Sequence, residues 1–387
     1  MIKVLRILNR FNLGGPVYNA SYLTSDLSSD FETMLIGGPH EDGEADALYI
    51  AHQLGLEPVV IEEMRRSVNP IQDLRALQRI REIIKEFKPD IVHTHASKAG
   101  ALGRIAARLE RVPVVVHTYH GHVFHSYFGS IKTSIYKIIE RTLAKFTTAI
   151  VTISPHQRIE ICDIHRIVDS KKAHVIPLGF DLQRFDVGNT ERRKTFRIAY
   201  QLEEEEVAIA IVGRLVPIKN HSLLIRAVGA MKEKRIRLFI VGDGPEKTAL
   251  TALCDELKLT HSADNQIAHV QFIGWHKRIE NILPGFDIVA LSSDNEGTPV
   301  SLIEAQSAKL PVISTNVGGV SDIVAHGKTG LIVPPKDLGS FISALEELVS
   351  DKEQRICMGE AGQKAVLQAF SKERLARDMS ALYRSLL

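Results

Sequence analysis

The sequence predicts an α/β protein with two doubly wound, Rossmann-like domains. Its 387 residues exceed the roughly 250 to 300 at which one hydrophobic core stops growing. Short runs rich in Val and Ile recur, and each is followed by a Gly-containing turn and an amphipathic segment. This alternation of strand and helix is typical of parallel sheets. A polar stretch, residues 186–206, separates the runs into two sets, and each set is large enough for a core of its own.

The predicted strands follow from these apolar runs. In the first half of the chain they cover residues 4–8, 33–36, 58–61, 91–93, 112–117, 148–153 and 173–176. In the second half they cover residues 207–212, 236–241, 270–273, 288–291 and 311–314. We therefore expect parallel strands in both halves, joined by helices.

The domain boundary is predicted near residue 185. This gives an N-terminal domain over residues 1–185, a C-terminal domain over 186–370 and a C-terminal helix over 371–387. We expect the helix to dock its apolar face back on the N-terminal domain. That face carries Leu375, Met379, Leu382, Tyr383 and Leu386.

The composition limits the classes of function. Lys and Arg total 48 and Asp and Glu 46, a balance that gives no reason to expect a nucleic-acid partner. The three cysteines form neither a CxxC pair nor a disulfide framework, which favours a reducing compartment. No stretch approaches the roughly 18 uncharged apolar residues of a membrane span. We therefore expect a cytoplasmic protein.

Basic residues concentrate in one part of the N-terminal half. Residues 11–64 contain no Lys or Arg, whereas residues 65–145 contain fifteen basic and six acidic residues. Within this part, residues 131–145 place Lys and Arg around an apolar stripe. Two interpretations remain open, namely a helix lying on an anionic membrane surface and a core-facing helix with a solvated basic side. The first would place the protein peripherally at the inner face of the membrane.

A glycine pair, Gly14 and Gly15, directly follows the first predicted strand and precedes a predicted helix at 17–27. Glycine lets backbone approach a ligand closely, and a helix N-terminus attracts anions. A structural tight turn is the alternative. The dinucleotide fingerprint G-x-G-x-x-G is absent here, which argues against a nicotinamide-dependent oxidoreductase.

The loops of the C-terminal half carry charged residues at the carboxyl ends of predicted strands, where open parallel sheets bind ligands. Arg214 and Lys219 follow the strand at 207–212, and a guanidinium and an ammonium there can bind one diphosphate. Glu296 and Glu304 follow the strand at 288–291. Glu296 is predicted in a loop and Glu304 two turns along the next helix, where a solvated surface glutamate is the alternative.

These motifs together resemble the retaining glycosyltransferases of family four. The matching motifs are Arg214-x4-Lys219, Gly242-Asp-Gly-Pro245, Glu296-x7-Glu304, Gly318-Gly319 and Gly327-x2-Gly330. The Gly14-Gly15 loop, residues 116–121 and residues 177–185 extend the resemblance over nearly the whole chain. The resemblance implies the GT-B architecture, in which two Rossmann-like domains face each other across a cleft. The C-terminal domain would bind the nucleotide sugar and the N-terminal domain the acceptor.

The resemblance also implies roles for single residues. Arg214 and Lys219 would clamp the diphosphate, and Glu304 would accept hydrogen bonds from the ribose hydroxyls. Glu296 would face the transferred sugar, and His120 would lie beside the anomeric centre. The further candidate substrate-binding residues are Gly14, Gly15, Gly274, Gly297, Thr298, Pro299, Val300 and Ser301. Lys98, just before a predicted helix, is a candidate contact for an anionic acceptor.

The expected activity is transfer of a sugar, with retention, from a nucleotide diphosphate sugar to a glycan or lipid-linked acceptor. We favour a UDP-sugar and a role in cell-surface polysaccharide synthesis. Many family members have an aromatic residue and a glycine where this chain has Thr298 and Pro299, so the sugar itself is not specified. The alternatives are a nucleotide-sugar 2-epimerase of the same fold and a non-catalytic nucleotide-binding module.

No cofactor and no metal are expected, because two cations and a helix dipole can replace a divalent ion at the diphosphate. The nucleotide sugar is then a co-substrate. His93, His95, His117 and His120, with His122 and His125, suggest metal ligation by number alone. We expect side-chain alternation along a strand to turn His93 and His95 to opposite faces, which argues against chelation.

Overall fold

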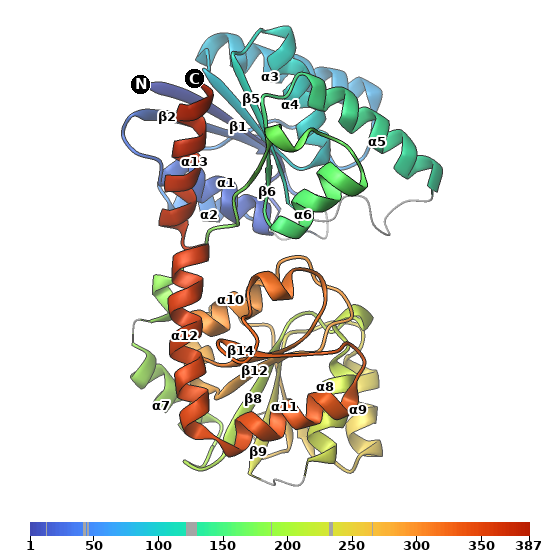
Figure 1. Ribbon diagram of the computed structural model, residues 1–387, viewed down its shortest axis with the longest axis vertical. Coiled ribbons are helices and arrows are strands. Elements are labelled where there is room, and N and C mark those ends of the chain that lie inside the picture. Colours follow the sequence, from blue (N-terminus) through green and yellow to red (C-terminus); the bar gives the residue numbers. More distant parts are fainter. Residues whose placement is uncertain are drawn as a thin grey trace. The chain divides into compact units, whose positions relative to one another are not determined.

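The chain forms two compact units, each built around a parallel sheet flanked by helices (Figure 1). The computed structural model describes residues 1–12, 14–41, 44, 46–120, 130–186, 188–231, 235–264 and 266–387, without the side chains of 130–132. The first unit comprises Met1–Phe180 and Phe370–Leu387, and the second comprises Asp181–Ala369. The chain thus enters the second unit slightly before residue 185.

The first unit contains, in its described part, a seven-stranded sheet of order β3-β2-β1-β4-β5-β6-β7. All neighbouring strands are parallel. The central strands are nearly continuous runs of buried residues because helices cover both faces of such a sheet. The strands are β1 (Ile2–Arg10), β2 (Phe31–Gly38), β3 (Val59–Val60), β4 (Ile91–His95), β5 (Val114–Tyr119), β6 (Ala149–Thr152) and β7 (Ala173–Val175).

Local signals in the sequence account for the helices of this unit. In α3, Asn69 accepts hydrogen bonds from the amides of Ile71 and Gln72, and Pro70 occupies the first helical turn. The helices are α1 (Gly15–Ser25), α2 (Leu48–Gln53), α3 (Pro70–Phe87), α4 (Ser97–Leu109), α5 (Ser130–Lys145), α6 (Pro155–Ile159) and α13 (Lys372–Leu386). A π-helical turn, η1 (Glu160–Ile164), directly follows α6, and η2 (Ser170–Lys172) is a short 3-10 turn.

The C-terminal helix α13 packs on the first unit, next to α1 (Figure 1). Ser371 caps it by accepting a hydrogen bond from the Arg374 amide, and the Arg374 guanidinium donates to the carbonyls of Pro177 and Leu178. The apolar face predicted from the sequence enters one cluster with residues of β1, β4, β5 and β6. Burial of this face attaches the end of the chain to the N-terminal sheet.

The second unit contains, among its described residues, a seven-stranded parallel sheet of order β10-β11-β9-β8-β12-β13-β14. Its strands are β8 (Val207–Val212), β9 (Ile236–Val241), β10 (His261–Ser262), β11 (Val270–Gly274), β12 (Ile288–Leu291), β13 (Val312–Thr315) and β14 (Gly330–Val333). Two of these were not predicted as strands. β10 has two polar residues and no apolar run, and β14 was interpreted as part of a glycine motif.

Six helices of the second unit cover its sheet, in the part that the structure describes. They are α7 (Asn189–Ala199), α8 (His221–Ala230), α9 (Lys247–Glu256), α10 (Val300–Ser307), α11 (Leu338–Ser350) and α12 (Lys352–Phe370). Short turns connect them, namely η3 (Gln183–Phe185), η4 (Pro217–Lys219), η5 (Ile279–Asn281), η6 (Leu283–Gly285) and η7 (Gly318–Asp322). Apolar residues of the strands and of α8, α9 and α11 form the core.

Each sheet has a point where the strand order reverses. In the first unit this point lies between β1 and β4, and in the second it lies between β8 and β12. Ligands of doubly wound sheets bind outside the carboxyl ends of the strands at such a point. The loops there carry most of the residues predicted to bind substrate.

Candidate functional site

The loops after β8 and β12 are tied together by hydrogen bonds. The Asp294 amide donates to the Ile218 carbonyl at 2.8 Å, and Asn220 Nδ2 donates to Asp294 Oδ1 at 3.2 Å. Ser292 Oγ donates to the Asn220 carbonyl at 2.8 Å. Asn220 adopts a left-handed conformation, with φ of 45°, between η4 and α8. These contacts bring together the loop that carries Arg214 and Lys219 and the loop that carries Glu296.

Lys219 and Glu296 form an ion pair in this arrangement. Lys219 Nζ lies 2.6 Å from Glu296 Oε1, which also accepts a hydrogen bond from Ser293 Oγ at 2.5 Å. The Lys219 side chain is 24% exposed and that of Glu296 8%. The contact between the residues assigned to the diphosphate and to the sugar was not predicted from the sequence. Ser293 was not predicted either, since its only signal is its place after a predicted strand.

Arg214 lies at the same sheet edge with its side chain exposed to solvent. We find no side-chain hydrogen bond or ion pair for it among the described residues, so its guanidinium donors are open to a ligand. The Lys219 stem passes close to Gly213, where an added Cβ would lie 3.7 Å from Lys219 Cε. Within the described part of the chain, the loop after β8 therefore presents Lys219 as a paired cation and Arg214 as an unpaired one.

Two glycine motifs shape these loops through backbone packing. Gly318 has a φ of 51°, and a Cβ there would lie 1.7 Å from the Glu296 carbonyl oxygen. The Gly319 amide donates to the Gly297 carbonyl at 3.0 Å. Gly242 allows an equally close backbone contact with the loop after β8, since a Cβ there would lie 1.9 Å from the Gly213 carbonyl oxygen. Both positions require glycine because backbone occupies the space of a side chain.

The helix α10 begins at Val300, directly after the loop that carries Glu296. No side chain among the described residues caps its N-terminus, and the amides of Val300 and Ser301 have no acceptors within the helix. Pro299 is buried and Thr298 half-buried, while a Cβ on Gly297 would meet no atom within 4 Å. Such an N-terminus can bind an anion.

Gly274 ends β11, at the same edge of the sheet. It has a φ of 68°, and its carbonyl accepts a hydrogen bond from the Gly242 amide at 2.8 Å. A Cβ there would meet no atom within 4 Å. The space beside Gly274 is therefore open, and contact with substrate stays a prediction.

Glu304 lies further along α10 and is not a solvated surface residue. Its side chain is 17% exposed, and Oε1 lies 3.3 Å from Arg184 Nη2 on η3. Removal from water, together with the nearby Glu280, raises the pKa of the Glu304 carboxyl to about 7, although Arg184 acts in the opposite direction. Arg184 lies within residues 177–185, which extend the family resemblance, but no role was predicted for it from the sequence.

In the first unit, His120 follows β5 and contacts the last residue of β4. His95 Nδ1 lies 2.8 Å from His120 Nε2, and burial lowers the pKa of His120 to about 4. His120 is therefore neutral near pH 7, with one donor and one acceptor nitrogen. Its Nδ1 has no hydrogen-bond partner in the described part of the chain. The predicted companions His122 and His125, and Gly121 of the same motif, lie outside the described residues.

His93 and His95 correct one expectation from the sequence. Their rings stack with centroids 4.3 Å apart, so they share one face of the sheet and do not point to opposite faces. Side chains two positions apart on a strand project to the same side, and the alternation argument was misapplied. Both ring nitrogens of His93 have hydrogen-bond partners. Nδ1 lies 2.5 Å from Tyr383 Oη, and Nε2 lies 2.7 Å from Thr118 Oγ1. Among the described residues no group of three or more His, Cys, Asp or Glu side chains is arranged to hold a metal.

Gly14 and Lys98 lie at the point of strand reversal in the first unit. Gly14 precedes α1, and a Cβ on Gly15 would meet no atom within 4 Å, which leaves its backbone open. Lys98 pairs with Asp73 at 2.5 Å and donates to the carbonyls of Arg65 and Ser67. These contacts join α4 to α3 and favour a structural role for Lys98, so contact with an acceptor stays a prediction.

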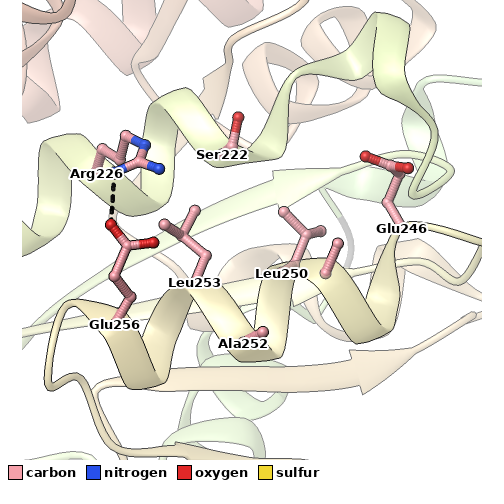
Figure 2. A pocket seen from close by; sticks show the side chains of 8 residues that line it. Ser222, Arg226, Glu246, Leu250, Ala252, Leu253 and Glu256 are labelled. Carbon is pink, nitrogen blue, oxygen red and sulfur yellow. Dashed lines mark ion pairs between the residues drawn. The ribbon is translucent and has the colours of Figure 1, made fainter.

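A surface hollow of about 400 Å³ lies elsewhere in the second unit, between α8 and α9 (Figure 2). Leu250 and Leu253 line it, and an ion pair of 3.6 Å between Arg226 and Glu256 closes one end. None of the residues predicted to bind substrate lines it. The loops after β8 and β12, not this hollow, define the candidate site.

Comparison with known proteins gives matches over both units. Residues 192–365 match the family model described as glycosyl transferases group 1, and residues 28–184 match glycosyltransferase family 4. The chain is 36% identical over 292 residues, 74% of its length, to an Escherichia coli UDP-Gal:alpha-D-GlcNAc-diphosphoundecaprenol alpha-1,3-galactosyltransferase, covering 73% of that protein. It is 26% identical, over 84% of each chain, to the Staphylococcus aureus capsular polysaccharide biosynthesis glycosyltransferase CapM.

A solved structure confirms the architecture. The crystal structure of Anabaena Alr3699/HepE in complex with UDP superimposes with a TM-score of 0.83 at 18% identity, covering 99% of this chain and 100% of that chain. Two doubly wound units of this kind define the class of GT-B glycosyltransferases. The chain belongs to glycosyltransferase family four.

Proposed function

We propose that this protein is a retaining glycosyltransferase that transfers a sugar from a UDP-sugar to a lipid-linked or glycan acceptor in cell-surface polysaccharide synthesis. The observation that carries the proposal is the placement of Arg214, Lys219 and Glu296 at the strand reversal of the second unit, with Glu304 on the helix that follows. The names of the Escherichia coli and Staphylococcus aureus relatives support the donor and acceptor classes. The UDP complex of the Anabaena protein supports the nucleotide.

The proposed reaction is a front-face displacement. The bond between the anomeric carbon and the diphosphate breaks, and the acceptor oxygen bonds to that carbon on the same face. The acceptor proton passes to the leaving phosphate oxygen. Arg214 and Lys219 would stabilise negative charge that grows as the donor bond breaks, which lowers the barrier more than it strengthens ground-state binding. His120 is neutral, and its Nδ1 has no partner among the described residues, so it would offer one hydrogen bond beside the sugar.

The first test is a panel of UDP-, GDP- and ADP-sugars assayed for thermal stabilisation of the protein. A ligand at about 100 times its Kd should stabilise the folded state by about 2.7 kcal/mol. The UDP-sugars should stabilise it most, and release of UDP should require an acceptor. Conversion of the donor without an acceptor would instead support the 2-epimerase, which the names of the relatives do not favour. Stabilisation without any turnover would support a binding module.

Chelation is expected to leave the activity unchanged, because Arg214, Lys219 and the N-terminus of α10 supply positive charge at the diphosphate. Initial rates with and without EDTA, at constant ionic strength, measure this directly. Loss of transfer with EDTA, restored by Mg²⁺ or Mn²⁺, would contradict metal independence.

We also propose that α5 docks on an anionic membrane surface. Ile135, Ile138 and Ile139 are 53%, 60% and 44% exposed, so part of the predicted apolar stripe faces solvent and not the core. Arg141 and Lys145 are exposed on the same helix. Exposed isoleucines beside cations are typical of helices that lie in a membrane interface. In the described part of the chain, no helix is both long and apolar enough to cross a bilayer.

Binding to anionic vesicles is expected at low salt, since each basic side chain near such a surface contributes about 1 kcal/mol. The variant Ile135→Ser/Ile138→Ser should sediment less with phosphatidylglycerol vesicles. Ile198→Ser, at a 66% exposed isoleucine of α7, is the matched control and should sediment like the unaltered protein. Equal sedimentation with neutral and anionic vesicles would remove the membrane proposal.

A further inference from the structure

An ion pair places a cation beside the carboxyl assigned to the donor ribose. Arg184 Nη2 on η3 lies 3.3 Å from Glu304 Oε1 on α10, and their side chains are 38% and 17% exposed. The Arg184 guanidinium also lies over the ring of Phe185, 4.8 Å from the ring centroid. Partial burial makes this pair stronger than one on the open surface.

The turn that carries Arg184 is held by its neighbours. Arg192 Nη1, on α7, donates to the Arg184 carbonyl at 2.9 Å and to the Glu280 carbonyl at 3.4 Å. Ser307 Oγ, at the end of α10, donates to the Leu182 carbonyl at 3.0 Å. Helices α7 and α10 thus hold the backbone of the turn that carries Arg184.

A second carboxyl lies in the same cluster. Glu280, on η5, is 7% exposed, and its Oε1 lies 3.2 Å from Arg278 Nε. Its Oε2 has no hydrogen-bond partner among the described residues. Glu280 disfavours a negative charge on Glu304, whereas Arg184 favours it. The strands β12 and β13, which also contact α10, carry no ionisable side chain.

We infer that Arg184 is a positioning residue for donor binding, which favours the ionised form of the Glu304 carboxyl and holds one of its oxygens. This inference rests on the proposed function. An ionised carboxylate accepts hydrogen bonds from both ribose hydroxyls, whereas a protonated carboxyl must donate one of its own. Arg184 contacts no reacting atom in this scheme, and it acts through Glu304.

The inference predicts how donor affinity depends on pH. The pKa of Glu304 lies at about 7, above the ordinary carboxyl range, so the ionised form gains population as the pH rises through 7. Donor affinity should therefore rise over the same range. Without Arg184 the pKa moves higher, and the rise in affinity moves to higher pH. Without Glu280 the rise moves to lower pH.

The experiment is calorimetric titration of the full chain with UDP-galactose between pH 6 and 9, a range in which the diphosphate diester does not titrate. Arg184→Met should weaken binding about three- to tenfold at pH 7 and less at pH 9, since each pH unit changes the ionised fraction by up to tenfold. Arg184→Lys should keep part of the wild-type dependence of affinity on pH. Glu280→Gln should move the rise in affinity to lower pH, whereas Arg184→Met moves it to higher pH. Glu304→Gln should remove this pH dependence.

The outcomes separate the inference from the proposed function. A loss in Arg184→Met that is equal at every pH, or a pH-independent wild-type affinity, would overturn the inference and leave the proposed function intact. Absence of binding by the wild-type protein at every pH, for UDP-galactose and for every other UDP-sugar of the panel, would overturn the proposed function and the inference together. A shift to higher pH in Arg184→Met with a shift to lower pH in Glu280→Gln would support the inference, because damage to packing does not move two profiles in opposite directions.

Discussion

Replacing Arg214 with alanine is expected to lower kcat/KM by about 10² to 10³, because loss of charge-assisted hydrogen bonds to a developing anion costs on the order of 3 to 4 kcal/mol. Arg214 is exposed and has no internal partner among the described residues, so its removal leaves no buried charge behind. The effect on the rate should therefore come without a loss of stability. Steady-state kinetics with a UDP-sugar and an acceptor measure it.

Lys219→Ala should fall in the same range, for a related reason. Its ammonium is proposed to neutralise the diphosphate, and it also pairs with Glu296 at 2.6 Å. Removing it leaves the mostly buried Glu296 carboxyl without its cation, so some stability should be lost as well. Arg226→Ala, which breaks a surface ion pair on α8, is the matched control and should keep full activity. If kcat/KM changes less than threefold in both Arg214→Ala and Lys219→Ala, and both variants fold, the assignment of these two residues to the diphosphate is contradicted.

The two glutamates are expected to separate on a plot of UDP affinity against turnover. Glu304 is assigned to the ribose, which does not change during the reaction, so Glu304→Gln should weaken donor binding and raise KM more than it lowers kcat. Glu296 is assigned to the sugar, so Glu296→Gln should lower kcat. Its affinity for free UDP should stay nearly unchanged, because the amide oxygen can still accept hydrogen bonds from Lys219 and Ser293.

The same pair of variants tests the assignment itself. If Glu296→Gln loses UDP affinity and Glu304→Gln keeps it, the two roles are reversed. If neither variant changes either quantity, the spacing of the two glutamates is a coincidence and the donor binds elsewhere. Measurements at pH 8, above the pKa of about 7 of Glu304, keep the wild-type carboxyl mainly ionised and make the comparison clear.

Much of the fold could be predicted because its signals are local. An apolar run followed by glycine and an amphipathic segment indicates strand, turn and helix within about 30 residues, whichever unit it belongs to. Two strands were missed for different reasons: β10 has two polar residues and no apolar run, whereas β14 begins at Gly330 and was interpreted as part of a glycine motif. The motif residues were placed at strand ends for the same reason, and the strand ends of a parallel sheet share one edge.

The sequence by itself determined which residues stand at the carboxyl ends of the strands, but only the tertiary structure decided which of them meet. Lys219 and Glu296 are 77 positions apart, Arg184 and Glu304 are 120 apart, and His93 and Tyr383 are 290 apart. Such contacts depend on strand order and on how helices dock, and neither leaves a periodic pattern in the chain. Burial is decided in the same way. The Glu304 carboxyl has a pKa of about 7 because α10 packs beside η3, which removes the carboxyl from water, and because the charge of Glu280 acts on it, whereas a helix-surface glutamate with the same sequence neighbours would remain an ordinary carboxylate.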